Sequence, residues 1–174
     1  SAGFGLHNQI QSIYTSYVQT EIADNTYLLT NTNLDYTTSR HAALTYDWNI
    51  NEHLRLKAET YYQQLDNVPV ERKPSSFSSL NTGSSFAPSD VDSLINNGKG
   101  TNYGIELTLE RFFNKGYYFL VTSSLFESTY EGSDGIKRNT GFNTQYVLNA
   151  LAGKEWRVGK KKNYLVFNVK LTTI

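Results

Sequence analysis

The chain of 174 residues contains no cysteine and no methionine. Without cysteine it cannot form disulfides, thiolate metal sites or a cysteine nucleophile. Its 16 basic residues balance its 16 acidic residues, so no net field favours nucleic acid as a partner. Because the chain begins at Ser1 without a Met or a leader-like stretch, we expect a mature piece of a longer protein.

Long apolar runs are also missing, since no stretch of about 18 apolar residues occurs and no transmembrane helix is expected. Aromatic residues are abundant, with 13 Tyr, 9 Phe and 2 Trp, although only 39% of all residues are hydrophobic. Aromatic side chains favour strands, and modest total hydrophobicity fits strands whose two faces meet different surroundings. The composition therefore favours an all-β fold over a compact helical core.

Alternating side chains are clearest in the stretch LRLKAETYYQQL, residues 54–65. One strand face would carry Leu54, Leu56, Ala58, Thr60 and Tyr62, and the other would carry Arg55, Lys57, Glu59, Tyr61 and Gln63. The same period of two recurs over about 41–50, 102–113, 117–130, 143–156 and 164–174, and an earlier strand is expected near 5–17. Removing a charged group from water without a partner costs several kcal/mol, so the charged face must contact water.

The connections between these strands alternate between short and long. Short turns are expected at about 51–53, 114–116 and 157–162, and long segments at about 18–40, 66–101 and 131–142. An antiparallel meander with this rhythm has all its turns at one end and all its long loops at the other, as outer-membrane barrels do. We predict that residues 1–174 form an all-β, up-and-down antiparallel meander of about seven long strands, an arc of a larger transmembrane β-barrel.

The segment 66–101 is expected to be a long, partly ordered extracellular loop. Its stretch PSDVDSLINNG, residues 88–98, predicts a short helix of one or two turns that Ser89 can cap. The Ser-rich part of the loop carries Phe77 and Phe86. Because loops longer than about 15 residues are commonly functional or disordered, these two rings are candidate ligand contacts.

Patterns that would indicate catalysis or metal binding do not occur in the sequence. His7, His41 and His53 lie far apart without ligand spacing, so no metal site is expected. No P-loop and no GxSxG elbow is present. Glu106 and Glu110 would share a strand face about 13 Å apart, too far for a glycosidase pair. We predict a protein that is not an enzyme and needs no cofactor.

The stretch NNGKGTNYGIELTLERFFNKGYYFLVTSSLFESTYEG, residues 96–132, resembles the late-barrel region of TonB-dependent outer-membrane receptors. The resemblance is to the Bacteroidetes type with an N-terminal carboxypeptidase-regulatory-like domain. Within this stretch an Asn- and Gly-rich loop leads into a strand with the sequence GIEL at 104–107. HAALTYDWNINEHLRLKAETYYQ (41–63) and LNALAGKEWRVGKKKN (148–163) fit the same region, so the resemblance covers most of residues 40–174.

The resemblance implies a segment of a barrel of about 22 strands in the bacterial outer membrane that takes up a glycan, a peptide or a metal chelate. Its implied partners are outer-membrane lipid, the rest of the receptor chain with its plug, TonB through an N-terminal region, and a surface lipoprotein. The family's plug domain, TonB box and terminal aromatic have no counterpart here. We therefore expect a fragment that, in isolation, self-associates through strand edges.

Candidate ligand contacts on the charged face, which would line the lumen of the barrel, are Arg55, Lys57, Glu59, Glu106 and Glu110. Two other functions remain open. One is a soluble β-sandwich carbohydrate-binding module that uses Tyr and Trp as stacking platforms, and the other is a cell-surface structural or adhesion fragment. A sandwich predicts short strands with connections of mixed length. Detergent extraction from an outer-membrane fraction would favour the receptor, and free solubility would favour the module.

Overall fold

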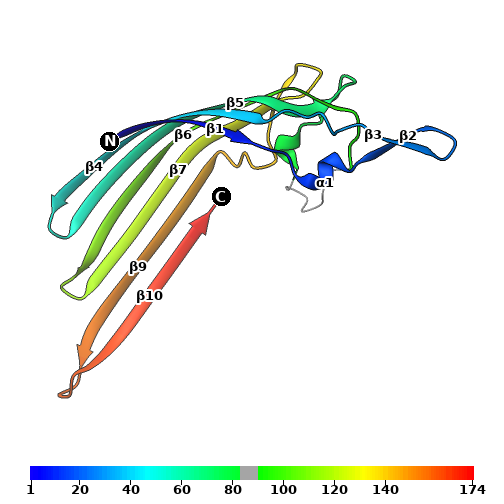
Figure 1. The fold of residues 1–174 in the computed structure, drawn as a ribbon. Helices are drawn as coiled ribbons and strands as arrows, with labels where there is room; N and C mark the ends of the chain where they lie inside the picture. The colour runs from blue at the N-terminus through cyan, green and yellow to red at the C-terminus, as the bar shows by residue number, and fades with distance from the viewer. Residues whose placement is uncertain (83–89) are drawn as a thin grey trace.

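The computed structural model describes residues 1–82 and 90–174, which form an antiparallel sheet that follows the chain in order (Figure 1). The main path is β1-β4-β5-β6-β7-β9-β10, and β8 pairs with β7. Its strands are β1 (Ala2–Gln9), β4 (Thr37–Asn51), β5 (Leu54–Glu71), β6 (Leu94–Asn114), β7 (Tyr117–Glu131), β8 (Lys137–Asn139), β9 (Tyr146–Val158) and β10 (Asn163–Thr173). The prediction of an all-β, antiparallel meander is confirmed.

Three small elements lie beside this sheet. Strands β2 (Gln19–Ala23) and β3 (Thr26–Leu29) form a separate hairpin. Helix α1 (Ile13–Ser16) and the 3₁₀ helix η1 (Ser79–Asn81) are each less than two turns long. In the described part of the chain, no helix is long and apolar enough to cross a membrane. The strand expected near 5–17 instead ends at Gln9, and α1 follows it.

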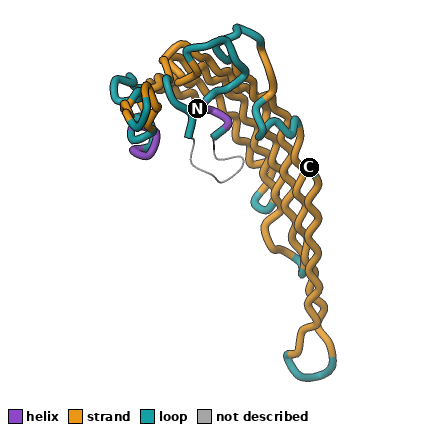
Figure 2. The backbone as a smooth tube through the Cα atoms, turned by 90° about the vertical axis from the view of Figure 1, so that its right-hand side faces the viewer, coloured by secondary structure: helices purple, strands orange, loops and turns teal. Residues whose placement is uncertain are grey.

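The short turns and the long connections gather at opposite ends of the sheet, as the sequence predicts (Figures 1 and 2). Residues 52–53, 115–116 and 159–162 make the turns, whereas 10–36, 72–93 and 132–145 make the long connections. Lys115 and Gly116 both have positive φ, 52° and 80°. Two such residues match the right-handed twist of the flanking strands in a tight hairpin, so Gly116 suits the β6–β7 turn.

The helix predicted over 88–98 is wrong in its described part. Leu94 pairs with Glu71, and Ile95 pairs with Val70, so both residues belong to β6. A helix of one or two turns is marginal by itself, whereas a strand here gains a hydrogen-bonded partner in β5. As a result β5 and β6 extend into the expected loop 66–101, and the connection shortens to 72–93. Phe86 and Ser89 lie outside the described residues.

The alternation of side chains gives the sheet two different faces. The strand registers place one largely uncharged set of side chains together. Many of its apolar members are between 44% and 62% exposed: Leu44, Tyr46, Trp48, Tyr62, Ile105, Leu107, Leu125, Leu165, Phe167, Val169 and Leu171. We call this the apolar face and the opposite side the polar face. Among the residues that the structure describes, no second layer covers the apolar face.

The buried core is small and lies at the loop end of the sheet. Its apolar members are Val68, Val70, Leu94 and Tyr130. Asn31, only 1% exposed, ties the connections to this core. Its Nδ2 donates to the carbonyls of Thr15 and Val91 at 3.0 and 2.9 Å, and its Oδ1 accepts from the Leu94 N–H at 2.9 Å. The long connections are therefore held to the core and form one packed layer.

We expect Asn31→Ala to loosen this layer, because each buried group left without a partner costs about 1–3 kcal/mol. Amide hydrogen exchange should show faster exchange in 10–36 and at Leu94, with a loss of about 2 kcal/mol or more in local opening free energy. The exposed Asn33 provides the matched control Asn33→Ala. Equal exchange rates in the two variants would contradict the role given to Asn31.

Candidate ligand-binding surface

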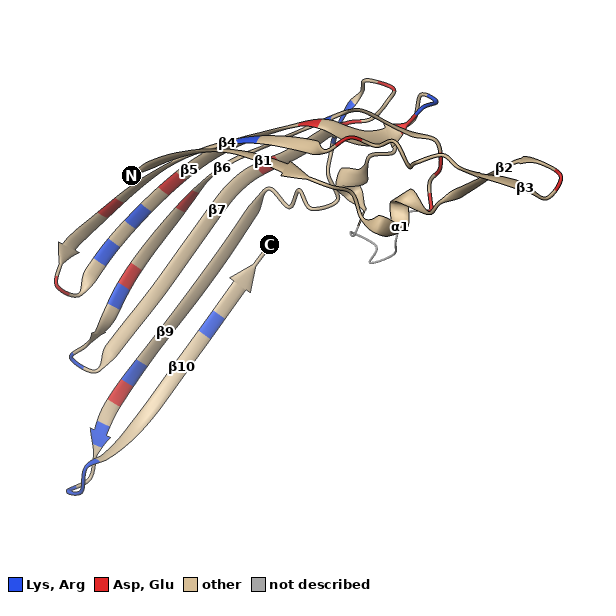
Figure 3. Cartoon of the chain, in the orientation of Figure 1, with Lys and Arg blue, Asp and Glu red and all other residues tan. Residues whose placement is uncertain are grey.

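The candidate residues Arg55, Lys57, Glu59, Glu106 and Glu110 all lie on the polar face. Arg55 pairs across the sheet with Glu110, and Glu59 with Glu106. Figure 3 shows charged positions on β4, β5 and β6, and further ones on β9 and β10. The strand registers thus place these five residues on one face, and they add Asp47 of β4, the cross-strand partner of Lys57.

Ion pairs link most of this cluster. Arg55 donates through Nε to Asp47 Oδ1 at 2.9 Å and through Nη2 to Asp47 Oδ2, and its Nη1 lies 3.6 Å from Glu110. Lys57 Nζ lies 3.0 Å from Glu59. The side chains are roughly one-third exposed, so solvent screens these pairs and each contributes little to stability. Four carboxylates against two cations, counting Glu106, leave an excess of two negative charges.

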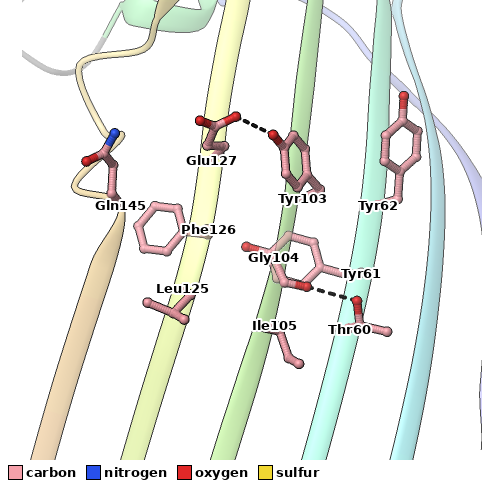
Figure 4. A pocket seen from close by; sticks show the side chains of 10 residues that line it. All are labelled: Thr60, Tyr61, Tyr62, Tyr103, Gly104, Ile105, Leu125, Phe126, Glu127 and Gln145. Carbon is pink, nitrogen blue, oxygen red and sulfur yellow. Dashed lines mark hydrogen bonds between the residues drawn. The ribbon is translucent and has the colours of Figure 1, made fainter.

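Two glycines on the polar face make room for tyrosine rings. A Cβ added at Gly104 would meet Tyr61 Oη at 2.9 Å, and one added at Gly153 would meet Tyr118 Cε1 at 2.2 Å. Figure 4 shows the Tyr61 ring reaching across toward Gly104. Aromatic side chains commonly fill the gap that a strand glycine leaves. Gly153, which weakens the strand pattern in the sequence, is therefore part of a cross-strand contact.

A row of amide and hydroxyl side chains crosses the polar face nearer the loop end. Gln63 Nε2 donates to Ser39 Oγ at 2.9 Å, and Asn102 Nδ2 donates to Gln63 Oε1 at 2.8 Å. Ser128 Oγ donates to Asn102 Oδ1 at 2.6 Å and lies 2.8 Å from Thr140 Oγ1, which donates to it. This polar row, Ser39-Gln63-Asn102-Ser128-Thr140, spans β4 to β7 and the segment before β9.

Two adjoining cavities of about 340 and 160 Å³ lie where the loops meet the polar face. Both are lined by Gln9 and Thr37, and we call them together the loop-end groove. Amide and imidazole groups come from His7, Gln9, Gln11 and Gln63, and hydroxyls from Ser12, Thr15, Thr37, Ser39, Ser79 and Thr82. The apolar lining is Ile10, Leu65, Phe77, Leu80 and Leu94.

Phe77, a candidate from the sequence, lies in this groove because η1 folds back over the sheet. Leu80 of η1 approaches so closely that a Cβ at Gly100 would meet Leu80 Cδ1 at 2.5 Å. Gly100 pairs with Leu65, whose side chain belongs to the polar face. Phe77 and η1 therefore cover the outer end of the polar face, which sequence patterns do not reveal.

A third, broader depression of about 840 Å³ opens on β5, β6 and β7 (Figure 4). Six of its lining residues belong to the apolar face: Thr60, Tyr62, Tyr103, Ile105, Leu125 and Glu127. The Tyr103 hydroxyl donates to the Glu127 carboxylate.

The three histidines stay apart, with only His7 in the groove, and the described residues hold no group of three or more His, Cys, Asp or Glu side chains suited to a metal.

Comparison of the chain with protein-family models, with curated proteins and with solved structures finds no match. The features that bear on its function are the two faces of the sheet, the polar row and the loop-end groove. These features offer hydrogen bonding and an aromatic surface, which suit ligand binding.

Asp134 and Arg138 stabilise the 132–145 connection. Arg138 donates to Asp134 Oδ1 and Oδ2 at 2.9 and 2.6 Å, and the Ile136 N–H donates to Oδ1 at 3.0 Å. These bonds, chiefly those from Arg138, lower the pKa of Asp134 to about 2 from its ordinary 3.8. The same connection is tied to η1, because the Gly141 N–H donates to Asn81 Oδ1 at 3.0 Å.

The low pKa of Asp134 predicts acid sensitivity in this loop. Because the folded pKa lies below the unfolded one, the bridge stabilises the loop fully above about pH 4 and loses this effect as pH falls toward 2. Hydrogen exchange in 132–141, corrected for intrinsic rates, should therefore show constant protection down to about pH 4 and a decline below it. Asp134→Asn should lower protection and remove the decline. The same acid profile in both proteins would refute this assignment.

Proposed function

We propose that this chain is a segment of a TonB-dependent receptor that takes up a nutrient across the bacterial outer membrane. The observation that carries the proposal is the contrast between the two faces of one long-stranded meander. The apolar face is exposed and uncovered, whereas the polar face carries ion pairs and the loop-end groove. A barrel wall between lipid and a wet lumen needs this contrast.

Strand length supports a membrane-spanning role. Strands β5 and β6 have 18 and 21 residues, whereas ordinary globular strands have about 5 or 6 and a spanning strand needs about 9–11. The apolar face is uncharged between Arg111 and Lys154 at the turn end and Glu127 at the loop end. The β5 segment from Leu54, the partner of Arg111, to Tyr62 is about 26 Å long. At a tilt of about 40° this length spans about 20 Å along the membrane normal.

Aromatic residues border this uncharged band at both ends. At the turn end the Arg111 guanidinium lies 4.3 Å from the Tyr117 ring centre, and Lys154 Nζ lies 5.2 Å from that of Trp156. At the loop end the rings are Tyr62, Tyr103 and Tyr146, all exposed. Amphipathic rings settle at the lipid–water boundary. The two borders are therefore the proposed positions of the membrane interfaces.

In this proposal the polar face lines the lumen, and the loop layer lies outside the cell. Arg55, Lys57, Glu59, Glu106 and Glu110 then meet lumen water, while Phe77 faces an incoming ligand. The ligand is a nutrient that reaches the groove from outside, and a surface lipoprotein would deliver it over the loops. TonB would act through the plug, which occupies the lumen in such receptors.

The free edges of the sheet support a barrel wall. Among the described residues β1 pairs only with β4, and β10 only with β9. Unpaired edges of this length recruit further strands. Within the receptor they would join the rest of the barrel, and in the isolated segment they would pair between copies. A soluble sandwich, in contrast, would need a second sheet on the apolar face, and residues 1–82 and 90–174 provide none.

Adjacent substitutions on opposite faces test the proposal. We expect Leu107→Arg in the full-length protein to impair barrel assembly, because an arginine at the bilayer midplane costs roughly 2–4 kcal/mol on a lipid face. The control Thr108→Arg puts the same side chain on the polar face, between Glu106 and Glu110, and should assemble normally. Heat-modifiable migration and abundance in outer-membrane fractions measure assembly. If the two variants assemble equally well, or if the wild-type protein is freely soluble, the proposal fails.

A further inference from the structure

Among the described residues that line the loop-end groove, none is Asp, Glu, Lys or Arg. Charged residues make up 18% of the chain, and the same face carries charged side chains nearer the turn end, among them Asp47, Arg55 and Glu106. The groove therefore differs from the rest of this face because its polar groups are uncharged. Its larger cavity, about 340 Å³, lies within the range of about 300–1,000 Å³ that is common for small-molecule sites.

Two polar side chains in the groove are available to a ligand. In residues 1–82 and 90–174, the side chains of His7 and Gln9 have no hydrogen-bonding partner, although Gln11 Nε2 donates to Thr37 Oγ1 at 2.8 Å. The imidazole and the amide each offer a donor and an acceptor. Hydroxyl groups, which also donate and accept, are the complementary chemistry.

The groove continues into the polar row through Ser39 and Gln63. From β1 to β7 the path β1-β4-β5-β6-β7 crosses four strand intervals, which is about 19 Å at roughly 4.8 Å each. Along this length the side chains His7, Ser39, Gln63, Asn102 and Ser128 present neutral amide, imidazole and hydroxyl groups. The surface is thus a linear hydrogen-bonding track that runs across the strands.

Phe77 adds an apolar surface at the start of this track. Its ring lines the groove and is half-buried, and its N–H donates to Ser75 Oγ at 3.2 Å, which helps fix the loop. An aromatic face beside hydrogen-bonding groups suits a sugar ring, which has C–H groups on its faces and hydroxyls at its edge.

We propose that the groove and the polar row bind an uncharged, linear oligosaccharide that lies across β1 to β7. His7 and Gln9 hydrogen-bond its hydroxyls, and Phe77 stacks on one of its sugar rings. This inference rests on the proposed function, because it assigns the ligand class of that receptor. An anionic metal chelate fits less well, since none of the described groove residues is Lys or Arg and the charged cluster on the same face has an excess of negative charge.

The test uses the purified full-length receptor on an array of gluco-, manno-, xylo- and N-acetylglucosamine oligomers. Uronic-acid oligomers, a ferric tris-catecholate chelate and a mixed peptide pool are the competing probes. We expect a neutral oligomer to bind, and Phe77→Ala and Gln9→Ala each to weaken its binding about tenfold. The matched controls are Phe142→Ala, at an exposed phenylalanine outside the groove, and Gln64→Ala, on the opposite face beside Gln63. Both should bind like the wild type.

Two results overturn this assignment while the receptor proposal stands: selective binding of the acidic oligomers, the chelate or the peptides by a correctly inserted receptor, or equal losses in site and control variants. Heat-modifiable migration, measured for every variant, separates lost binding from lost assembly. Absence of the wild-type protein from the outer-membrane fraction overturns the receptor proposal instead, and the ligand assignment with it.

Discussion

Strand register is the constraint on which the rest of this structure depends. Side chains alternate with a period of two, so a shift of β5 by one residue against both β4 and β6 would move every β5 side chain to the other face. Arg55, Lys57 and Glu59 would then join Leu107 and Leu109, and the ion pairs with Asp47 and Glu110 would be lost. The apolar face and the charged cluster thus specify the same register, and neither can form without the other.

Strand number, strand order and the identity of the two faces were predictable because each depends on local sequence. The alternation in 54–65 sorts side chains without knowledge of the partner strands, and turn signals such as the NKG before Tyr117 mark the strand ends. The helix over 88–98 failed for the opposite reason. Its apolar spacing fits a helix as well as a strand, and the long-range pairing of Leu94 and Ile95 with β5 decides between them.

The loop-end groove and the polar row depend on contacts that no local pattern encodes. Asn102 bonds to Gln63, 39 residues away, and Gln63 to Ser39, 24 residues away. In the sequence each is one polar residue in an alternating strand, and only register makes them neighbours. Asn31 likewise reads as an ordinary loop residue, although it joins three separate segments at the core. Phe77 was a candidate by composition, but its place in the groove follows from how η1 folds back.

The packing that holds the loops and the groove proposed to bind a ligand both lie at the loop end of the sheet. The apolar face contributes no buried core to the described chain. The packed side chains at the loop end, Val68, Val70 and Leu94, must therefore hold the loops by themselves. Hydrogen bonds complete this layer: Asn31 fixes 10–36, and Asn81 joins η1 to the 132–145 connection. Because the groove is formed between these same loops and the sheet, its shape is set before any ligand arrives. A preorganised groove loses less conformational entropy on binding, so neutral side chains that form weak individual hydrogen bonds can together hold a ligand.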